Sequence, residues 1–498
     1  MNIVRLSSRK TAIIGFMSFF TLAVSGQEKA AFEISHSNPP SEALAPLRFL
    51  AADELMGRGT MRSEIHIAAR YVSEEFRATG LRTCQGANDY FQSFDIKSQV
   101  PSKTGTLKMA GKSYTIGNEV VEINGDNLTF SAPVVYAGFG TGEDLDKAGV
   151  QGKIVVAKMG FSDTSKINEA FHDVDLKRKM VKDRGGVALI ELYRPMGFPW
   201  SGIVRFLSSE RPEIENSDKL PELLLNDSLV ASKLQGQGTI GSIDITDVVN
   251  TYTPAENVLG WVEGSDPKLK DEFIVLSAHY DHLGVAKKPK MEEGKMDSIY
   301  NGARDNALGT TAVIDAARYF AKHPPKRSIL FIAYTGEEIG EIGSKYFSEH
   351  PLVPLRQIVY NLNIDNASYD DTTIVTVVGL GRTTADADIK KACAAFQVTA
   401  MPDLEPEQDL FDRSDNVNLA EKGIPAPTFS LGMRKFDAEI NKRYHQLSDE
   451  VGNLNLSYCM KFINSFILSA ENIANDQTRP VWIPGDKYEA AAKTLYGN

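Results

Sequence analysis

The chain has 498 residues, of which 42% are hydrophobic and 24% are charged, so it can bury a large core and should fold into two or more domains. Its formal net charge of −11 opposes binding to nucleic acid, because an acidic surface repels phosphates. Cys84, Cys393 and Cys459 lack the clustered spacing of a zinc knuckle, and they can form one disulfide bond or none. Any bound metal ion is therefore expected to have His and carboxylate ligands.

Residues 1–26 have the features of an export signal. Arg5, Arg9 and Lys10 precede an apolar run from Thr11 to Val24, and small residues follow it. The run is short for a membrane span, although an uncleaved N-terminal anchor is the alternative. We therefore expect an exported protein, periplasmic or secreted, with no stable membrane span after the signal is removed.

Residues 27–104 are expected to form the N-terminal part of a catalytic domain. The segment from Ala43 to Gly80 has helical periodicity, and Gly80 should end its second helix. The positions at helical spacing there are Ile67, Ala68, Tyr71, Val72, Glu75 and Phe76. Between the two helices lies the turn-prone segment Leu55–Gly59, in which Arg58 either is solvated or contacts the catalytic domain.

Residues 105–252 change to short β-rich runs and are interpreted as an inserted accessory domain. Strands are predicted at Ala132–Gly138, Lys153–Lys158 and Val187–Ile190, and a helix at Val174–Arg184. Clustered histidines and acidic pairs are almost absent from this stretch. It is therefore not expected to carry the chemistry.

Residues 253–498 alternate strands with helices, which indicates an α/β domain with a mostly parallel central sheet flanked by helices. The predicted strands are Phe273–Leu276, Ser328–Ala333, Val359–Ile364 and Ala426–Ser430, and the predicted helices are Asp305–His323 and Leu454–Ile473. Ligand sites of such sheets lie beyond the carboxyl ends of the strands. Polar residues at those ends are therefore candidates for the site.

Three polar groups follow three of these strands: His279, the pair Glu337–Glu338, and Asp365. Each would be weak evidence alone, since a histidine after a strand is more often structural and a glutamate pair is usually a solvated helix start. Together they form a mixed nitrogen and oxygen ligand set that suits zinc or a similar divalent ion. The convergence of three distant segments on one sheet edge therefore predicts a metal site.

Two further carboxylates extend this set. Asp281 lies two residues after His279 in an extended segment, so it can accept a hydrogen bond from the other imidazole nitrogen and fix its tautomer. Asp305 lies on a glycine-containing turn at a helix start, where an ordinary N-cap is the alternative interpretation. Both are candidates for the same site.

The ordered motifs His-x-Asp, Gly-Ala-x-Asp-Asn, Glu-Glu, Asn-x-Asp and Tyr-His resemble those of the di-zinc aminopeptidases related to aminopeptidase Y, bacterial leucyl aminopeptidases and glutamate carboxypeptidase II. The resemblance runs from about Ala43 to Asp476. It implies a zinc-peptidase fold of the phosphorylase/hydrolase-like type, with the insertion as a protease-associated domain.

The resemblance also implies roles for individual residues. Two zinc ions would be bound by five ligands, with Asp305 bridging them and the peptide bond after it cis; the five are His279, Asp305, Glu338, Asp365 and His445. Glu337 would be the general base toward a metal-bound water, and Tyr444 would stabilise the oxyanion unless it is only a packed aromatic residue. The expected substrates are peptides with a free N-terminus.

Other functions stay open. A carboxypeptidase or dipeptidase of the glutamate carboxypeptidase type would need a cationic pocket, to which Arg304, Arg413 and Arg434 could contribute. A receptor-like module without catalysis and a glutaminyl cyclase are further alternatives. Arg304 and Asn416 depart from the residues usual in relatives, which leaves substrate preference open. The oligomeric state does not follow from the sequence.

Overall fold

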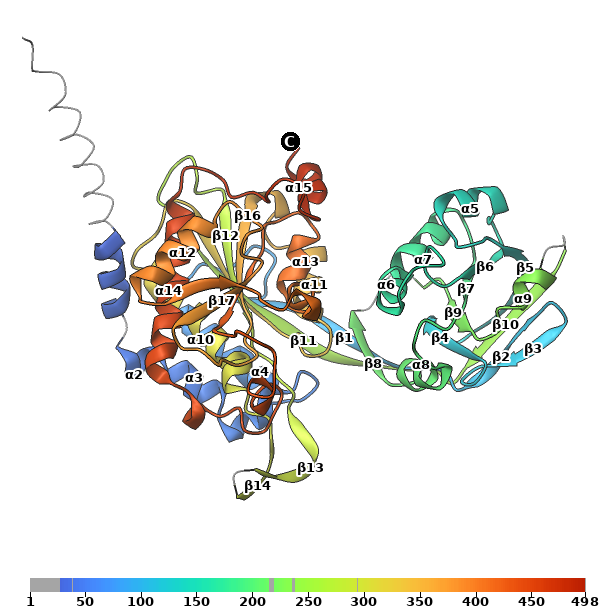
Figure 1. The fold of residues 1–498 in the computed structure, drawn as a ribbon, viewed down its shortest axis with the longest axis horizontal. Coiled ribbons are helices and arrows are strands. Elements are labelled where there is room, and N and C mark those ends of the chain that lie inside the picture. The colour runs from blue at the N-terminus through green and yellow to red at the C-terminus, as the bar shows by residue number, and fades with distance from the viewer. Residues whose placement is uncertain (1–26, 38, 215–218, 235–237, 293, 498) are drawn as a thin grey trace, which may run out of the picture. The chain divides into compact units, whose positions relative to one another are not determined.

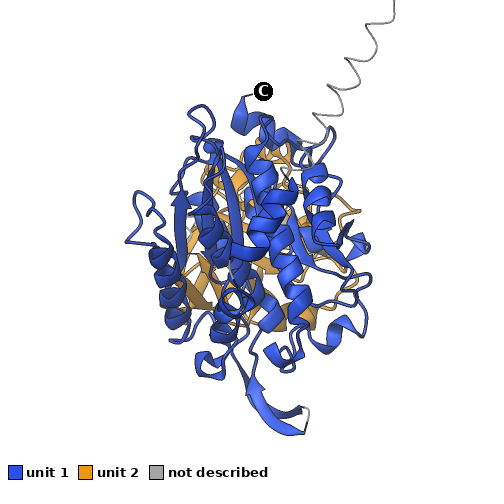
Figure 2. Cartoon of the chain, turned by 90° about the vertical axis from the view of Figure 1, so that its left-hand side faces the viewer, with its two compact units in different colours: residues 1–94, 254–498 blue, residues 95–253 orange. Residues whose placement is uncertain are grey.

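The computed structural model describes residues 27–37, 39–214, 219–234, 238–292 and 294–497 (Figure 1). The expected export signal, residues 1–26, lies outside these described residues. The chain divides into two compact units, the first built from the chain up to Phe94 and from Pro254 to Asn498, the second from Asp95–Thr253 (Figure 2). Our expected insertion began ten residues later, at residue 105, because β1 (Phe91–Val100) runs on from the first unit into the second.

The first unit contains a mixed sheet whose centre is parallel. The strand order is β18-β17-β19-β16-β12-β15-β11-β1-β8, and β15, β12, β16 and β19 pair in parallel. Its strands besides β1 are β11 (Val249–Val262), β12 (Phe273–His279), β15 (Ser328–Tyr334), β16 (Ile358–Ile364), β17 (Ile374–Val378), β18 (Thr399–Pro402) and β19 (Thr428–Leu431), whereas β8 (Arg211–Ile214), the last strand in this order, is formed by residues of the second unit. This confirms the predicted α/β class.

Helices cover both faces of this sheet. Alternate residues of β12 enter different apolar clusters: Ile274 packs in one with α4, α10, α12 and α14, and Val275 packs in the other with α11 and α13. The helices of the unit are α2 (Pro40–Ala43), α3 (Ala45–Leu50), α4 (Ile65–Thr79), α10 (Gly309–Phe320), α11 (Ile342–Glu349), α12 (Asp386–Ala395), α13 (Asn416–Ala420), α14 (Leu456–Asn475) and α15 (Glu489–Tyr496).

The N-terminal helices follow the predicted pattern with one exception. Gly80 ends α4 in the left-handed region at φ 80°, as expected of a glycine at this position. Ala68, Val72 and Phe76 are buried, whereas Ile67 is 50% exposed and therefore lies off the buried face. Ile65 occupies the buried face one turn earlier instead.

The second unit is β-rich and has apolar clusters of its own. Among its described residues, a sheet with the order β3-β2-β10-β5-β6-β7-β9-β4 contains β2 (Thr104–Met109), β3 (Lys112–Thr115), β4 (Val120–Asn124), β5 (Leu128–Tyr136), β6 (Ile154–Lys158), β7 (Ala188–Leu192), β9 (Glu222–Leu225) and β10 (Ile240–Thr246). Its helices are α5 (Gly142–Ala148), α6 (Ile167–His172), α7 (Val174–Asp183), α8 (Trp200–Leu207) and α9 (Val230–Lys233).

Several features of the first unit were not predicted. A hairpin of β13 (Val285–Glu292) and β14 (Lys295–Ile299) projects from it (Figure 1), and β17 and β18, which α12 connects, form one edge of the sheet. All three cysteines are buried free thiols. Among the helices that the structure describes, none combines the length and apolar character needed to cross a membrane.

Candidate metal centre

Three neighbouring parallel strands, β12, β15 and β16, end at the same edge of the sheet, and the first ligand candidates lie at or just after their ends. His279, the last residue of β12, is level with Tyr334 at the end of β15, and Ala278 is level with Ile364 at the end of β16. Glu337 and Glu338 follow β15 after a short turn, and Asp365 follows β16 directly. The predicted convergence on the carboxyl edge of the sheet is therefore what the fold produces.

Asp305 reaches the same place from a tight turn before α10. Gly302 starts this turn at φ 57°, and a Cβ atom there would lie 2.2 Å from the Asp305 carbonyl oxygen and 2.5 Å from a carbon of the His282 ring, so only glycine fits. The peptide bond between Asp305 and Asn306 is cis, as the family resemblance implies. The turn thus places the Asp305 side chain beside His279 and His445.

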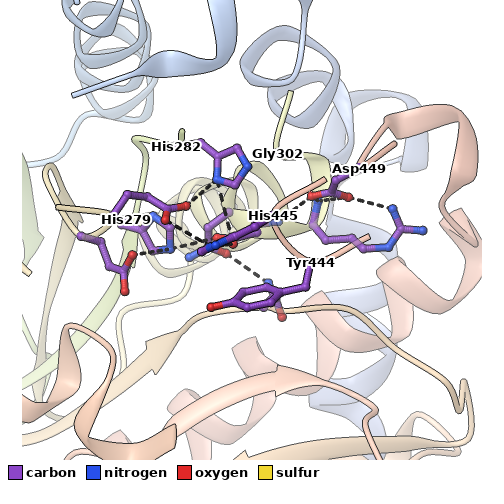
Figure 3. A network of polar contacts seen from close by, with 12 residues as sticks. His279, His282, Gly302, Tyr444, His445 and Asp449 are labelled. Atoms are coloured by element: carbon purple, nitrogen blue, oxygen red, sulfur yellow. Dashed lines mark hydrogen bonds and ion pairs between the residues drawn. The ribbon is translucent and has the colours of Figure 1, made fainter. Parts of the chain in front are cut away.

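His445 comes from the loop after β19 and adopts a left-handed backbone at φ 56°. The Tyr444 ring stacks on the His445 imidazole, with centroids 4.0 Å apart (Figure 3). His445 Nε2 lies 3.2 Å from Asp305 Oδ2 and 3.2 Å from Glu338 Oε2. The structure therefore brings His445 to the other four predicted ligands, although it is 80 residues beyond Asp365 in the chain.

The separations between these donor atoms fit metal coordination. His279 Nε2 lies 3.3 Å from Asp305 Oδ1 and 3.4 Å from Asp365 Oδ1. Two donors that bind one tetrahedral zinc ion at about 2.0–2.1 Å lie roughly 3.3 Å apart. The two oxygens of Asp305 face different histidines, which is the arrangement a bridging carboxylate requires.

The donors fall into two groups. Within the described residues, the groups of three or more side chains that could hold a metal ion are His279, Glu337 and Asp365, and separately His282, Asp305 and Glu338. Both lie in the first unit. His282 was not among the predicted residues: its buried Nδ1 lies 2.5 Å from Glu338 Oε1. The second histidine of the segment His279–Gly284 could have revealed it in the sequence.

The site attracts positive charge. Burial opposes a charge on His279, but Glu337 and hydrogen bonds with Asp281, Asp305 and Asp365 outweigh it and hold its pKa well above the ordinary value. Burial likewise opposes a charge on His445, and hydrogen bonds to Asp305 and Glu338 raise its pKa to about 10. Divalent cations would satisfy the same carboxylates, so the residues present fit a pair of metal ions.

Glu337 differs from its neighbour Glu338 in its surroundings. Burial raises the pKa of Glu337 well above the ordinary value, and the carboxylates of Asp365 and Glu338 add to this effect while His279 opposes it. Its side chain is 12% exposed, and Oε2 lies 3.9 Å from His279 Nε2. A carboxylate with a raised pKa at the edge of the donor set is suited to accept a proton.

Asp281 contacts two members of the first donor group, His279 and Glu337. It is fully buried, accepts a hydrogen bond of 2.6 Å from the Thr60 hydroxyl, and accepts one of 3.2 Å from the Glu337 backbone N–H. One of its oxygens lies 3.6 Å from His279 Nδ1, whose nearest acceptor is the Asp281 carbonyl at 3.3 Å. Asp281 is thus in place to orient His279, and its predicted role remains a prediction.

The donors open into a pocket of about 240 Å³. Its lining residues are Asp305, Glu337, Glu338, Gly340, Glu341, Asp365, Arg413, Tyr444 and His445. Glu341 was not predicted; burial, together with the Asp365 carboxylate, raises its pKa to about 7. Tyr444 presents its ring to this pocket, and burial raises the pKa of its phenol above the ordinary value, so it stays protonated at neutral pH.

Two of the three arginines considered for a cationic pocket lie elsewhere. Arg304 is buried, pairs with Asp449 at 2.8 Å, and its backbone N–H and that of Asp305 also donate to the Asp449 carboxylate. Arg434 pairs with Asp371 at 2.7 Å. Arg304 therefore supports the turn that carries Asp305. It does not line the pocket, and this corrects our expectation that Arg304 bears on substrate preference.

Asn416 is likewise structural. It is fully buried, and its amide donates to the carbonyls of Phe411 at 3.1 Å and Ala426 at 3.0 Å. These bonds connect the start of α13 with the chain that leads into β19. The second departure from the family pattern thus has no contact with the pocket.

Comparison with known proteins gives partial matches in sequence. Residues 257–467 match the sequence model of Peptidase family M28. A vacuolar membrane protease of Schizosaccharomyces japonicus is 24% identical over 159 residues, covering 30% of this chain and 17% of that protein. One of Saccharomyces cerevisiae is 29% identical over 112 residues, covering 22% and 10%. The chain thus spans less than a fifth of the length of these relatives.

A solved structure matches over nearly the whole chain. An aminopeptidase from Aneurinibacillus sp. strain AM-1 has a TM-score of 0.50 and 18% identity, and the match covers 92% of this chain and 98% of that one. At this identity the match shows a common fold. The inserted β-rich unit is part of the region covered.

Proposed function

Because residues 257–467 match the sequence model of Peptidase family M28, we propose that the chain is a zinc-dependent aminopeptidase of this family, which removes N-terminal residues from peptides. The observation that carries the proposal is the pair of donor groups, one with His279 and Asp365 and the other with Asp305 and Glu338, beside an acidic pocket. The name of the similar Aneurinibacillus protein, an aminopeptidase, supports this choice.

Zinc ions in these groups would supply Lewis acidity toward the substrate carbonyl and lower the pKa of a water molecule. His279 and Asp365 would hold one ion and Glu338 and His445 the other, with Asp305 shared. His282, hydrogen-bonded to Glu338, would hold that carboxylate in its orientation. We assign zinc because imidazole and carboxylate donors suit it.

Three side chains of the protein then have separate roles in the reaction. Glu337 takes a proton from the attacking water and delivers it to the leaving amine. Asp281 fixes the ring of His279, and the Tyr444 hydroxyl donates a hydrogen bond to the developing oxyanion. Each of these side chains lies in, or directly behind, the pocket described above.

The charge of the pocket favours a substrate with a free α-ammonium group. Five acidic side chains line it: Asp305, Glu337, Glu338, Glu341 and Asp365. Arg413 is the single cationic residue other than His445 among the described lining residues. Three of these carboxylates would be neutralised by the zinc ions, so Glu337 and Glu341 are the acidic groups left to face an α-ammonium group, which supports an aminopeptidase over a carboxypeptidase.

Three forms of one peptide test the proposal. The peptide with two free ends and its C-terminally amidated form should both lose their N-terminal residue, whereas the N-acetylated form should stay intact. A matched sample treated with a chelator should cleave none of them. Release of C-terminal residues from the acetylated peptide would overturn the proposal and favour carboxylate binding by Arg413.

We also propose that the protein is exported to the periplasm or beyond. The support is the charge and apolar pattern of residues 1–26. Fractionation of expressing cells should recover a product without these residues outside the cytosol. A cytosolic product that still begins at Met1 would contradict export.

A further inference from the structure

We propose that Arg58 is a positioning residue of the metal centre: its guanidinium ties together the two loops that carry the ligands, and so sets the zinc affinity of the protein. The inference rests on the proposed zinc function, since it concerns how that site is built. Arg58 belongs to the segment between α3 and α4, far in sequence from every donor.

The guanidinium of Arg58 is fully buried, and its acceptors among the described residues are backbone carbonyls. The acceptors are Tyr280 O at 2.8 Å, Leu50 O at 2.5 Å, Asn301 O at 2.6 Å and Gly302 O at 3.0 Å. Tyr280 lies between His279 and Asp281, and Gly302 starts the turn of Asp305. One side chain therefore connects both ligand-bearing loops.

The backbone around Arg58 makes further contacts with the first of these loops. The Arg58 carbonyl accepts a hydrogen bond of 3.1 Å from His282 N–H, and the Gly57 carbonyl accepts one of 3.0 Å from Gly284 N–H. A Cβ atom on Gly57 would lie 2.3 Å from the Gly284 oxygen, so the close approach requires glycine. Arg58 itself has a left-handed backbone at φ 48°, a conformation that non-glycine residues seldom adopt.

Thr60 extends the same segment to the next layer of the site. Its hydroxyl donates to Asp281 at 2.6 Å, and Asp281 in turn accepts the Glu337 N–H. Residues 57–60 thus contact the supports of His279, His282, Asp305 and Glu337. Partners of this kind typically change metal affinity by about 10- to 100-fold when they are removed.

The charge of Arg58 makes its two possible effects on zinc opposite in sign. No carboxylate of the described residues lies within ion-pair distance of it, and burial lowers its pKa to about 10, so it remains a cation at neutral pH. A cation close to the site repels zinc, and by Coulomb's law alone its removal would tighten zinc binding. If the guanidinium acts by holding the loops in place, its removal weakens zinc binding.

The test compares Arg58→Met and Arg58→Lys with Arg62→Met, a matched control whose side chain is 41% exposed. Zinc dissociation constants of the metal-free full chain are measured by competition with a chromophoric chelator, and its unfolding free energy by denaturant titration. We expect both Arg58 variants to bind zinc about 10- to 100-fold more weakly than the parent, and the Arg62 variant to match the parent.

An unchanged or tighter zinc affinity in folded Arg58→Met would overturn the proposal, as would a loss of stability alone. If Arg58→Met does not fold, Arg58→Lys decides, because a lysine keeps the charge but cannot reach four carbonyls in the same geometry. A parent that binds no zinc would refute the proposed function together with this inference. A parent with two zinc ions and variants of equal affinity would refute the role of Arg58 alone.

Discussion

Glu337 and Glu338 are neighbours in the chain, but they meet different partners. Glu338 lies 2.5 Å from His282 and 3.2 Å from His445, whereas Glu337 stays at the pocket edge with a raised pKa. We expect Glu337→Gln to lower turnover by about 10²- to 10⁴-fold, because the amide keeps the size of the side chain but cannot accept a proton. Zinc content should remain that of the parent.

Two further variants serve as comparisons for Glu337→Gln. The primary effect of Glu338→Gln should be weaker zinc binding. Glu349→Gln, which changes an exposed residue at the end of α11, should have the zinc content and turnover of the parent. Kinetic constants and metal content are measured on the same samples. If Glu337→Gln retained most of its turnover with both ions bound, another carboxylate of the pocket would have to be the base.

Some residues of the site could be predicted from the sequence, and others could not. His279, Glu338 and Asp365 could be predicted because each follows a recognisable apolar strand, and parallel strands end at one edge. His445 follows an irregular loop, so only the resemblance pointed to it. Arg58 could not be resolved, because its four acceptors are backbone carbonyls and backbone groups have no signature in the sequence.

At the level of elements, α10 contains a buried acid that is not part of the site. Burial raises the pKa of Asp315 to about 7, which its 2.9 Å contact with Arg318 only partly offsets. The unfolded chain releases this proton near pH 4. Between pH 4 and 7 the folded state therefore holds the extra proton, and the stability it contributes is lost as pH rises through 7.

The variant Asp315→Asn should remove this dependence, because an amide does not ionise. The unfolding free energy of the variant minus that of the parent should be larger at pH 8 than at pH 4.5. The increase should be up to about 4 kcal/mol for a pKa shift of this size. Denaturant titrations of both proteins at the two pH values measure the difference. An equal difference at both pH values would show that Asp315 does not titrate in this range.

Elements with a clear period were predicted well, and the others were not. β12, β15 and β16 appear as continuous apolar runs, and α14 has a long amphipathic pattern. The β13–β14 hairpin is exposed on both faces and rich in lysine, so it lacks the alternation that marks a strand. The sequence did not predict that β1 starts within the first unit, because the strand continues across the boundary between the units.

At the scale of the whole molecule, two units with separate apolar cores carry one metal centre. The donor groups lie in the first unit, so bound zinc should stabilise that unit alone, by about 4 kcal/mol for each ion when free zinc is 1,000 times the dissociation constant of its site. Calorimetry with and without a chelator should show one transition that moves to lower temperature and one that stays. Equal shifts of all transitions would mean that the units unfold together.

Zinc titration of the metal-free full chain tests the paired centre most directly. Cleavage of a peptide with a free N-terminus is followed while bound zinc is measured in the same samples. The geometry around Asp305 predicts that two ions bind per chain and that full activity requires the second. Full activity with a single tightly bound ion, and no response to further zinc, would contradict the two-metal mechanism.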